Sequence, residues 1–181
     1  MIGPTDMPTK TSLTPDFTVS PALTDADFSE LSALGFKSVL NVRPDGETAS
    51  QLASADAARA ARAADLAYAH IPVRKHDLFA DEIVSEAART LADLPAPVLA
   101  YCASGQRAVI LWAAASARSQ PVPRVLETLK DAGYDFEFLR DDLDAQADRA
   151  RWSNNATEAA ENAASIAVSQ PEAKSAERAA A

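Results

Sequence analysis

The segment PVLAYCASGQRAVILW contains a cysteine, Cys102, and an arginine, Arg107, separated by a short loop. A thiolate is a nucleophile toward phosphorus and sulfur, and a guanidinium can hold two oxygens of an oxyanion at once. The loop supplies backbone N–H groups that can converge on the same anion; its residues are Ala103, Ser104, Gly105 and Gln106. The combination predicts nucleophilic catalysis by Cys102, with Arg107 and the loop N–H groups binding the oxyanion.

An apolar strand and an apolar helix are expected on either side of this loop. The strand covers Pro97 to Tyr101, and the run AVILWAAASAR after Arg107 has the pattern of a buried helix. The start of a helix presents unpaired N–H groups and positive potential, which favour an anion and also favour a thiolate over a thiol. The alternative is an inert cysteine that packs as a small hydrophobic residue beside a solvent-facing Arg107. The joint occurrence of strand, cysteine, glycine, arginine and helix favours the chemical interpretation.

Short β-rich runs alternate with longer helical patterns along the chain. The expected strands are Lys37 to Val42, Tyr68 to Val73 and Pro97 to Tyr101. The expected helices are Thr24 to Leu34, Ala49 to Leu66, Asp81 to Leu94, Ala108 to Arg118, Leu126 to Ala132 and Tyr134 to Leu143. Strands separated by helices predict an α/β fold, with a central parallel or mixed sheet flanked by helices. We expect one domain at 15–150, between a flexible tail at 1–14 and an Ala/Glu-rich tail at 151–181.

The composition argues against several classes of function. The 181-residue chain has a formal net charge of -9 and no basic cluster, which disfavours nucleic-acid binding. A single cysteine allows neither an internal disulfide nor a cysteine-based metal site, and we expect no cofactor. Residues Met1 to Lys10 lack the features of a signal peptide and no run reaches membrane-spanning length, so we expect a cytoplasmic protein without a membrane partner. The sequence leaves the oligomeric state open.

Four segments of the chain resemble a known family. They are VSPALTDADFSELSALGFKSVLNVRPDGE at Val19 to Glu47, AYAHIPV at Ala67 to Val73, PVLAYCASGQRAVILW at Pro97 to Trp112, and LKDAGYDFEFLRDDL at Leu129 to Leu143. The family is the bacterial phosphatase-like domain found alone or fused to metallo-β-lactamase-type hydrolases, within the protein tyrosine phosphatase superfold. The resemblance implies the protein tyrosine phosphatase fold. It also implies a hydrolase that acts on a phosphorylated substrate, in which Cys102 attacks the phosphate ester.

The active loop departs from the pattern of these phosphatases at three points. It has one residue fewer between Cys102 and Arg107, Tyr101 where a histidine usually precedes the cysteine, and Ala108 where a hydroxyl residue usually follows the arginine. The short loop is similar to the rhodanese loop, which suits a cysteine persulfide better than a tetrahedral phosphate. A rhodanese-like sulfurtransferase or persulfide carrier therefore remains open, as does an inactive oxyanion-binding module.

Two further side chains are candidates for the site. Phosphatases of this superfold use an aspartate as general acid, and in IPVRKHDLFADE its usual position holds a basic residue. We assign the role to Asp77, with His76 and Asp81 as alternatives, although each also fits a solvated loop residue. Arg43 in NVRPDGE is a candidate for substrate contact. The sequence favours instead a structural role for Arg43, in an ion pair or in fixing a turn. His70 is expected to be a hydrogen-bonded residue of a strand.

Overall fold

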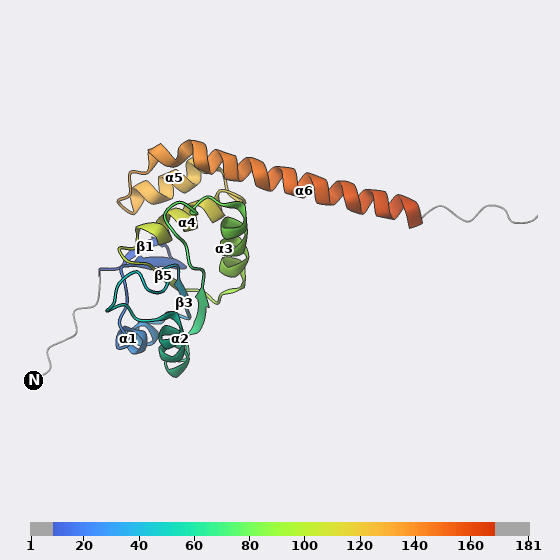
Figure 1. Cartoon of the computed structure of the whole chain (residues 1–181). Helices are drawn as coiled ribbons and strands as arrows, with labels where there is room; N and C mark the ends of the chain where they lie inside the picture. Colours follow the sequence, from blue (N-terminus) through green and yellow to red (C-terminus); the bar gives the residue numbers. More distant parts are fainter. Residues whose placement is uncertain (1–8, 169–181) are drawn as a thin grey trace, which may run out of the picture.

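The computed structural model describes residues 9–168, and the side chains of residues 9–161. A five-stranded sheet forms its centre (Figure 1). The strands are β1 (Thr11–Thr14), β2 (Phe17–Ser20), β3 (Ser38–Asn41), β4 (Ala67–His70) and β5 (Val98–Tyr101). The helices are α1 (Asp27–Ala33), α2 (Ser54–Ala63), α3 (Asp81–Asp93), α4 (Gln106–Ser116), α5 (Val122–Asp131), the 3-10 turn η1 (Glu137–Leu139) and α6 (Arg140–Val168).

The sheet is mixed, with the strand order β1-β2-β5-β3-β4. Strands β2, β5, β3 and β4 are parallel, and β1 adds to the edge as an antiparallel hairpin partner of β2. Asn41 pairs with Tyr101 on one side and with His70 on the other. The carboxyl ends of these three strands therefore lie at one edge of the sheet, where the segments that follow them can meet.

Helices cover both faces of the sheet (Figure 1). One hydrophobic cluster packs α1 and α2 against one face, where Val39 and Leu99 are fully buried. The other cluster packs α3, α4, α5 and the start of α6 against the opposite face, where Leu40 and Ala100 are buried. Successive residues of a strand point to opposite faces, so strands covered on both sides are apolar throughout, as VLAY in β5 is. The expectation of an α/β fold with a flanked central sheet is confirmed.

Several element boundaries differ from the sequence prediction. Helix α2 begins at Ser54 rather than Ala49, because the Asp45 carboxylate accepts hydrogen bonds from the backbone N–H and hydroxyl of Ser54. The segment between β3 and α2 is therefore a loop at the carboxyl end of β3. Helix α5 begins at Val122 rather than at Leu126, since the proline at its first turn starts the helix instead of preceding it.

Both ends of the described chain contain secondary structure that the sequence did not predict. Residues Thr11–Thr14, inside the expected N-terminal tail, form β1. The expected short helix at Tyr134 to Leu143 is instead η1 followed by α6, which runs from Arg140 to Val168 and extends beyond the sheet (Figure 1). Side chains 151–161 of α6 are exposed, and the division into one domain and two tails remains a prediction. None of the described helices has both the length and the apolar content needed to cross a bilayer.

Candidate active site

The loop that follows β5 is shaped by Gly105. This glycine has φ +87° and immediately precedes α4. A Cβ atom at this position would lie 3.2 Å from the carbonyl oxygen of Ser20 at the end of β2. Both the left-handed backbone and the close approach require a residue without a side chain. Gly105 therefore lets the chain turn from β5 into α4 while the loop packs against β2.

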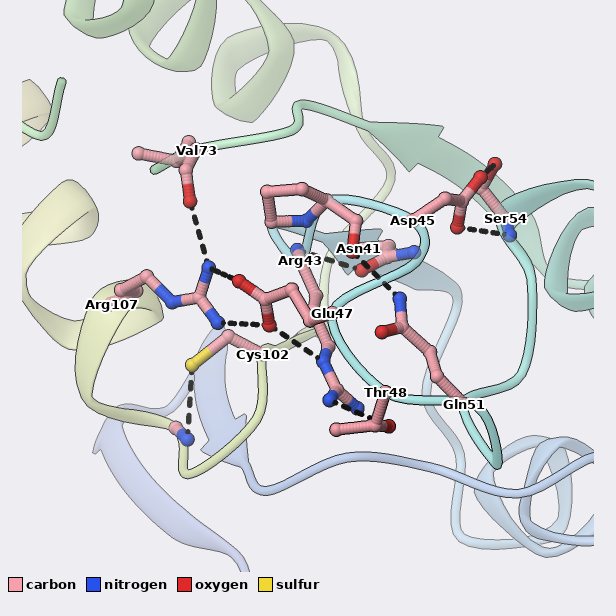
Figure 2. A network of polar contacts seen from close by, with 12 residues as sticks. Asn41, Arg43, Asp45, Glu47, Thr48, Gln51, Ser54, Val73, Cys102 and Arg107 are labelled. Atoms are coloured by element: carbon pink, nitrogen blue, oxygen red, sulfur yellow. Dashed lines mark hydrogen bonds and ion pairs between the residues drawn. The ribbon is translucent and has the colours of Figure 1, made fainter. Parts of the chain in front are cut away.

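The sulfur of Cys102 lies inside this loop. Its Sγ accepts a hydrogen bond from the N–H of Gly105 at 3.1 Å, and the residue is 1% exposed (Figure 2). The other predicted loop residues, Ala103, Ser104 and Gln106, are exposed. The sulfur is therefore buried, whereas most of the loop around it faces solvent.

Arg107 is held in one orientation by three hydrogen bonds (Figure 2). Nη1 donates to Glu47 Oε1 and to the carbonyl oxygen of Val73, and Nη2 donates to Glu47 Oε2, each at 2.8 Å. None of these three hydrogen bonds uses Nε, and the Cys102 side chain is a further neighbour of the guanidinium. The hydrogen bonds that Arg107 donates to Glu47 raise the pKa of Arg107 and burial opposes them, so the guanidinium keeps its positive charge.

Glu47 joins two arginines. Its Oε2 accepts from Arg107 and also from Nε of Arg43, at 2.9 Å. The hydrogen bond with Arg107 is the main cause that lowers the pKa of Glu47 to about 2; burial opposes it and Arg43 adds to it. The carboxylate is therefore ionised at neutral pH and balances one of the two positive charges.

Arg43 is fixed by its backbone as well as by its side chain. Its N–H donates to Asn41 Oδ1 and its carbonyl oxygen accepts from His70 Nε2, both at 2.9 Å. Its Nη2 donates to the hydroxyl of Thr48. These contacts agree with the structural role that the sequence favoured for Arg43, and with a hydrogen-bonded His70. Substrate contact by Arg43 remains a prediction.

Asp77 lies in the loop between β4 and α3, apart from the contacts that join Cys102 and Arg107. Among the described residues, the polar contact of its carboxylate is with His76 at 3.6 Å, and its side chain is 41% exposed. Val73, at the start of the same loop, is the residue that contacts Arg107. The structure therefore places the loop beside the site without joining the Asp77 side chain to it.

The pairing of Glu47 with Arg107 was missed by the sequence analysis. The two residues are 60 positions apart, so no local pattern links them. The available signal was topological: Glu47 follows β3, Arg107 follows β5, and these strands are neighbours. The strand order alone would have placed the two loops at the same edge of the sheet, within reach of each other.

A separate cavity of about 350 Å³ lies between the carboxyl ends of α3 and α4 and the start of β2. Phe17, Val98 and Trp112 are among the residues that line it. No residue from Cys102 to Arg107 does, so this cavity is not part of the candidate active site.

Comparison with known proteins identifies the family. Residues 10–119 match the model of the phosphatase-like domain of β-lactamase hydrolase-like proteins. A β-lactamase hydrolase-like protein of Agrobacterium fabrum is 40% identical over 87 residues, which are 48% of this chain and 20% of that protein. The matched segment thus spans about a fifth of the curated relatives.

Solved structures agree with this match. A protein of Neisseria meningitidis, described as a proposed phosphatase, has 30% sequence identity and a TM-score of 0.64, covering 75% of this chain and 96% of its own. The Pseudomonas aeruginosa protein TpbA, solved in complex with pTyr, has 16% identity and a TM-score of 0.52 over 83% of this chain and 99% of its own, and shows the fold alone. The protein belongs to the family of phosphatase-like domains of β-lactamase hydrolase-like proteins, and it has the protein tyrosine phosphatase fold.

Proposed function

We propose that this protein is a cysteine-dependent phosphatase-like hydrolase that acts on a phosphate ester. The observation that carries the proposal is the arrangement of the short loop, in which Cys102 Sγ faces the N–H of Gly105 beside a guanidinium held by Glu47 and Val73. A fixed donor-only group next to a nucleophile can stabilise charge that develops on a transferred phosphoryl group. The family and the fold support this reaction class.

The proposed reaction has two steps. The Cys102 thiolate attacks phosphorus, the bond from phosphorus to the ester oxygen breaks, and the leaving oxygen takes a proton from Asp77. Water then attacks phosphorus and gives a proton to Asp77, the bond from phosphorus to the Cys102 sulfur breaks, and inorganic phosphate and the thiolate are released. Arg107 and the loop N–H groups bind the phosphoryl oxygens in both steps. Asp77 must approach the site from its exposed position for this role.

Turnover of an aryl phosphate tests the proposal. We expect the wild-type protein to release phosphate from p-nitrophenyl phosphate, and Cys102→Ser to abolish that release while keeping the same unfolding temperature. Ser104→Ala is a matched control, because this exposed hydroxyl belongs to the same loop and makes no hydrogen bond among the described residues. Turnover that survives in Cys102→Ser, or no turnover of any phosphate ester by the wild type, would rule out the proposed mechanism.

Sulfur transfer is the second candidate, and the short loop and the paired guanidinium favour it. Only a short loop surrounds the buried sulfur, and both terminal nitrogens of Arg107 already bind Glu47. With thiosulfate, the thiolate would attack the sulfane sulfur, the S–S bond would break, and sulfite would leave behind a Cys102 persulfide. Intact-mass measurement after exposure to thiosulfate should then show one added sulfur atom that Cys102→Ser does not acquire.

Binding of phosphate without either reaction would instead support an inactive oxyanion-binding module.

A further inference from the structure

The loop between β4 and α3, residues 71–80, is attached to the rest of the molecule at both ends. At its start, the carbonyl oxygen of Val73 accepts a hydrogen bond from Arg107. Near its end, the carbonyl oxygen of Phe79 accepts from Gln146 Nε2 at 2.9 Å and from Arg149 Nη1 at 3.2 Å. Asp77 lies between these two attachments. One attachment thus belongs to the active site, and the other belongs to α6.

Gln146 is suited to hold the loop because its amide has partners on both sides. The residue is 1% exposed, and its Oε1 accepts from Nε and Nη2 of Arg118, at 3.1 and 2.7 Å. A guanidinium only donates and a carbonyl oxygen only accepts, so the amide oxygen must face Arg118 and the amide nitrogen must face Phe79. Reversing the amide would place two donors together and two acceptors together. The orientation of Gln146 is therefore fixed.

Arg118 makes this attachment rigid. It follows α4, and it also donates to Ser85 Oγ and Asp81 Oδ1 on α3, each at 2.6 Å. Helices α3, α4 and α6, which lie together on one face of the sheet in Figure 1, are thus connected through Arg118 and Gln146. A displacement of α6 would be transmitted to Phe79 through the hydrogen bonds from Gln146 and Arg149.

We propose that Gln146 is a positioning residue that anchors the 71–80 loop and so limits the positions from which Asp77 can approach Cys102. The proposal rests on the hydrolase function proposed above. Gln146 lies after residues 10–119, which match the family model, so helix α6 supplies a support that the matched segment does not contain. Without the Gln146 donor, Phe79 keeps only the longer hydrogen bond from Arg149, and the loop keeps its contact with Arg107 but gains freedom around Asp77.

The variant Gln146→Glu tests the contact of Gln146 with the loop without removing its contact with Arg118. The variant keeps an oxygen for Arg118, but it places a carboxylate oxygen where the donor to Phe79 stood. Ser85→Ala is the matched control, since it removes a hydrogen bond of Arg118 and leaves the bond to Phe79 intact. We expect faster amide hydrogen exchange across residues 71–80 in Gln146→Glu and unchanged exchange there in Ser85→Ala. Should Gln146→Glu fail to fold, Arg149→Met removes the second donor to Phe79 from an exposed position and should show a smaller increase in the same peptides.

A comparison of kcat for two substrates distinguishes positioning of the acid from a purely structural role. An alkyl phosphate needs a proton on its leaving oxygen, whereas p-nitrophenolate leaves well without one. We expect Gln146→Glu to lower kcat for the alkyl phosphate about tenfold, to change kcat for p-nitrophenyl phosphate less than about threefold, and to leave the alkylation rate of Cys102 unchanged.

The outcomes distinguish this proposal from the one on which it rests. Equal losses with both substrates, or loop exchange identical to that of Ser85→Ala, would overturn the role of Gln146. If the wild type hydrolyses no phosphate ester, the hydrolase proposal fails and the positioning of an acid fails with it. Hydrogen exchange would then still decide whether Gln146 holds the loop.

Discussion

At the scale of single residues, one carboxylate orders the polar part of the site. Glu47 binds both nitrogens at one side of the Arg107 guanidinium and shares an oxygen with Arg43. Without it, two positive side chains would stand next to each other with no counter-charge, and Arg107 would keep only the carbonyl oxygen of Val73. The direction of the Arg107 guanidinium therefore depends mainly on a residue of another loop.

We expect Glu47→Gln to lower kcat/KM for an aryl phosphate by about 10²-fold, because a misplaced binding group loses transition-state stabilisation. The variant should also lose about 1 to 3 kcal/mol of unfolding free energy, less than for a fully buried pair because the Glu47 side chain is 32% exposed. Glu82→Gln, an exposed change of the same kind on α3, should alter neither quantity. Activity of Glu47→Gln equal to that of Glu82→Gln would contradict this role.

The depressed pKa of Glu47 predicts a specific dependence of stability on pH. The folded-state pKa is about 2, below the ordinary value of 4.5, so the stabilising contribution is complete above about pH 4.5 and disappears as the pH falls toward 2. The difference in unfolding free energy between wild type and Glu47→Gln should therefore shrink over that interval. Denaturant unfolding at a series of pH values measures it, and a difference that stays constant down to pH 2 would show that the pKa is not shifted.

At the scale of elements, the junction of β5 with α4 depends on Gly105. Gly105→Ala forces a side chain into a left-handed backbone and against the carbonyl oxygen of Ser20. Gly133→Ala is a matched control, because Gly133 has φ +91° and open space where its Cβ would lie. Both variants should lose about 1 kcal/mol from the backbone, and Gly105→Ala should lose about 1 kcal/mol more.

The two glycine variants should also differ at the active site. Because the Gly105 N–H contacts Cys102 Sγ, Gly105→Ala should change the pH dependence of Cys102 alkylation, whereas Gly133→Ala should not. Equal effects of the two substitutions on stability and on alkylation would show that the contact with Ser20 does not matter.

Elements with strong local signals could be predicted, and those defined by distant partners could not. The core strands β3 and β5 lie within the predicted runs because SVLN and VLAY are buried on both faces. Strands β1 and β2 were missed because hydroxyl residues alternate with the apolar ones in TSLT and FTVS, and they are strands by virtue of pairing with each other and with β5. The early start predicted for α2 failed for the same reason: Asp45, nine positions away, determines where that helix begins.

The candidate site shows the same division. The contact of a loop N–H group with Cys102 could be predicted, because the strand, the glycine and the helix that form the loop are adjacent in the sequence. The partners of Arg107 did not, because Glu47 and the Val73 carbonyl come from loops after two other strands. Asp77 was chosen by its position in the sequence, and the structure gives its carboxylate a contact with His76 instead.

At the scale of the whole molecule, α6 divides into a packed part and an exposed part. Leu143 is fully buried and Gln146 nearly so, whereas residues 151–161 are exposed. A chain ended after residue 152 should keep its unfolding free energy to within about 0.5 kcal/mol. A chain ended after residue 142 should lose several kcal/mol of unfolding free energy, because it lacks the buried Leu143 and also Gln146, which binds Arg118. Thermal unfolding compares the two, and a large loss in the longer chain would contradict the expected C-terminal tail.

The register of the sheet has a consequence for the smallest unit that can carry the site. Asn41 stands opposite both Tyr101 and His70, so the sulfur, the carboxylate and the carbonyl that orients the guanidinium are brought together by three adjacent strands. A peptide copying CASGQR, or an excised β5–α4 fragment, would contain the sulfur and the guanidinium but neither of the acceptors that orient Arg107. Transplanting this site to another scaffold therefore means transplanting three strand ends at their native spacing.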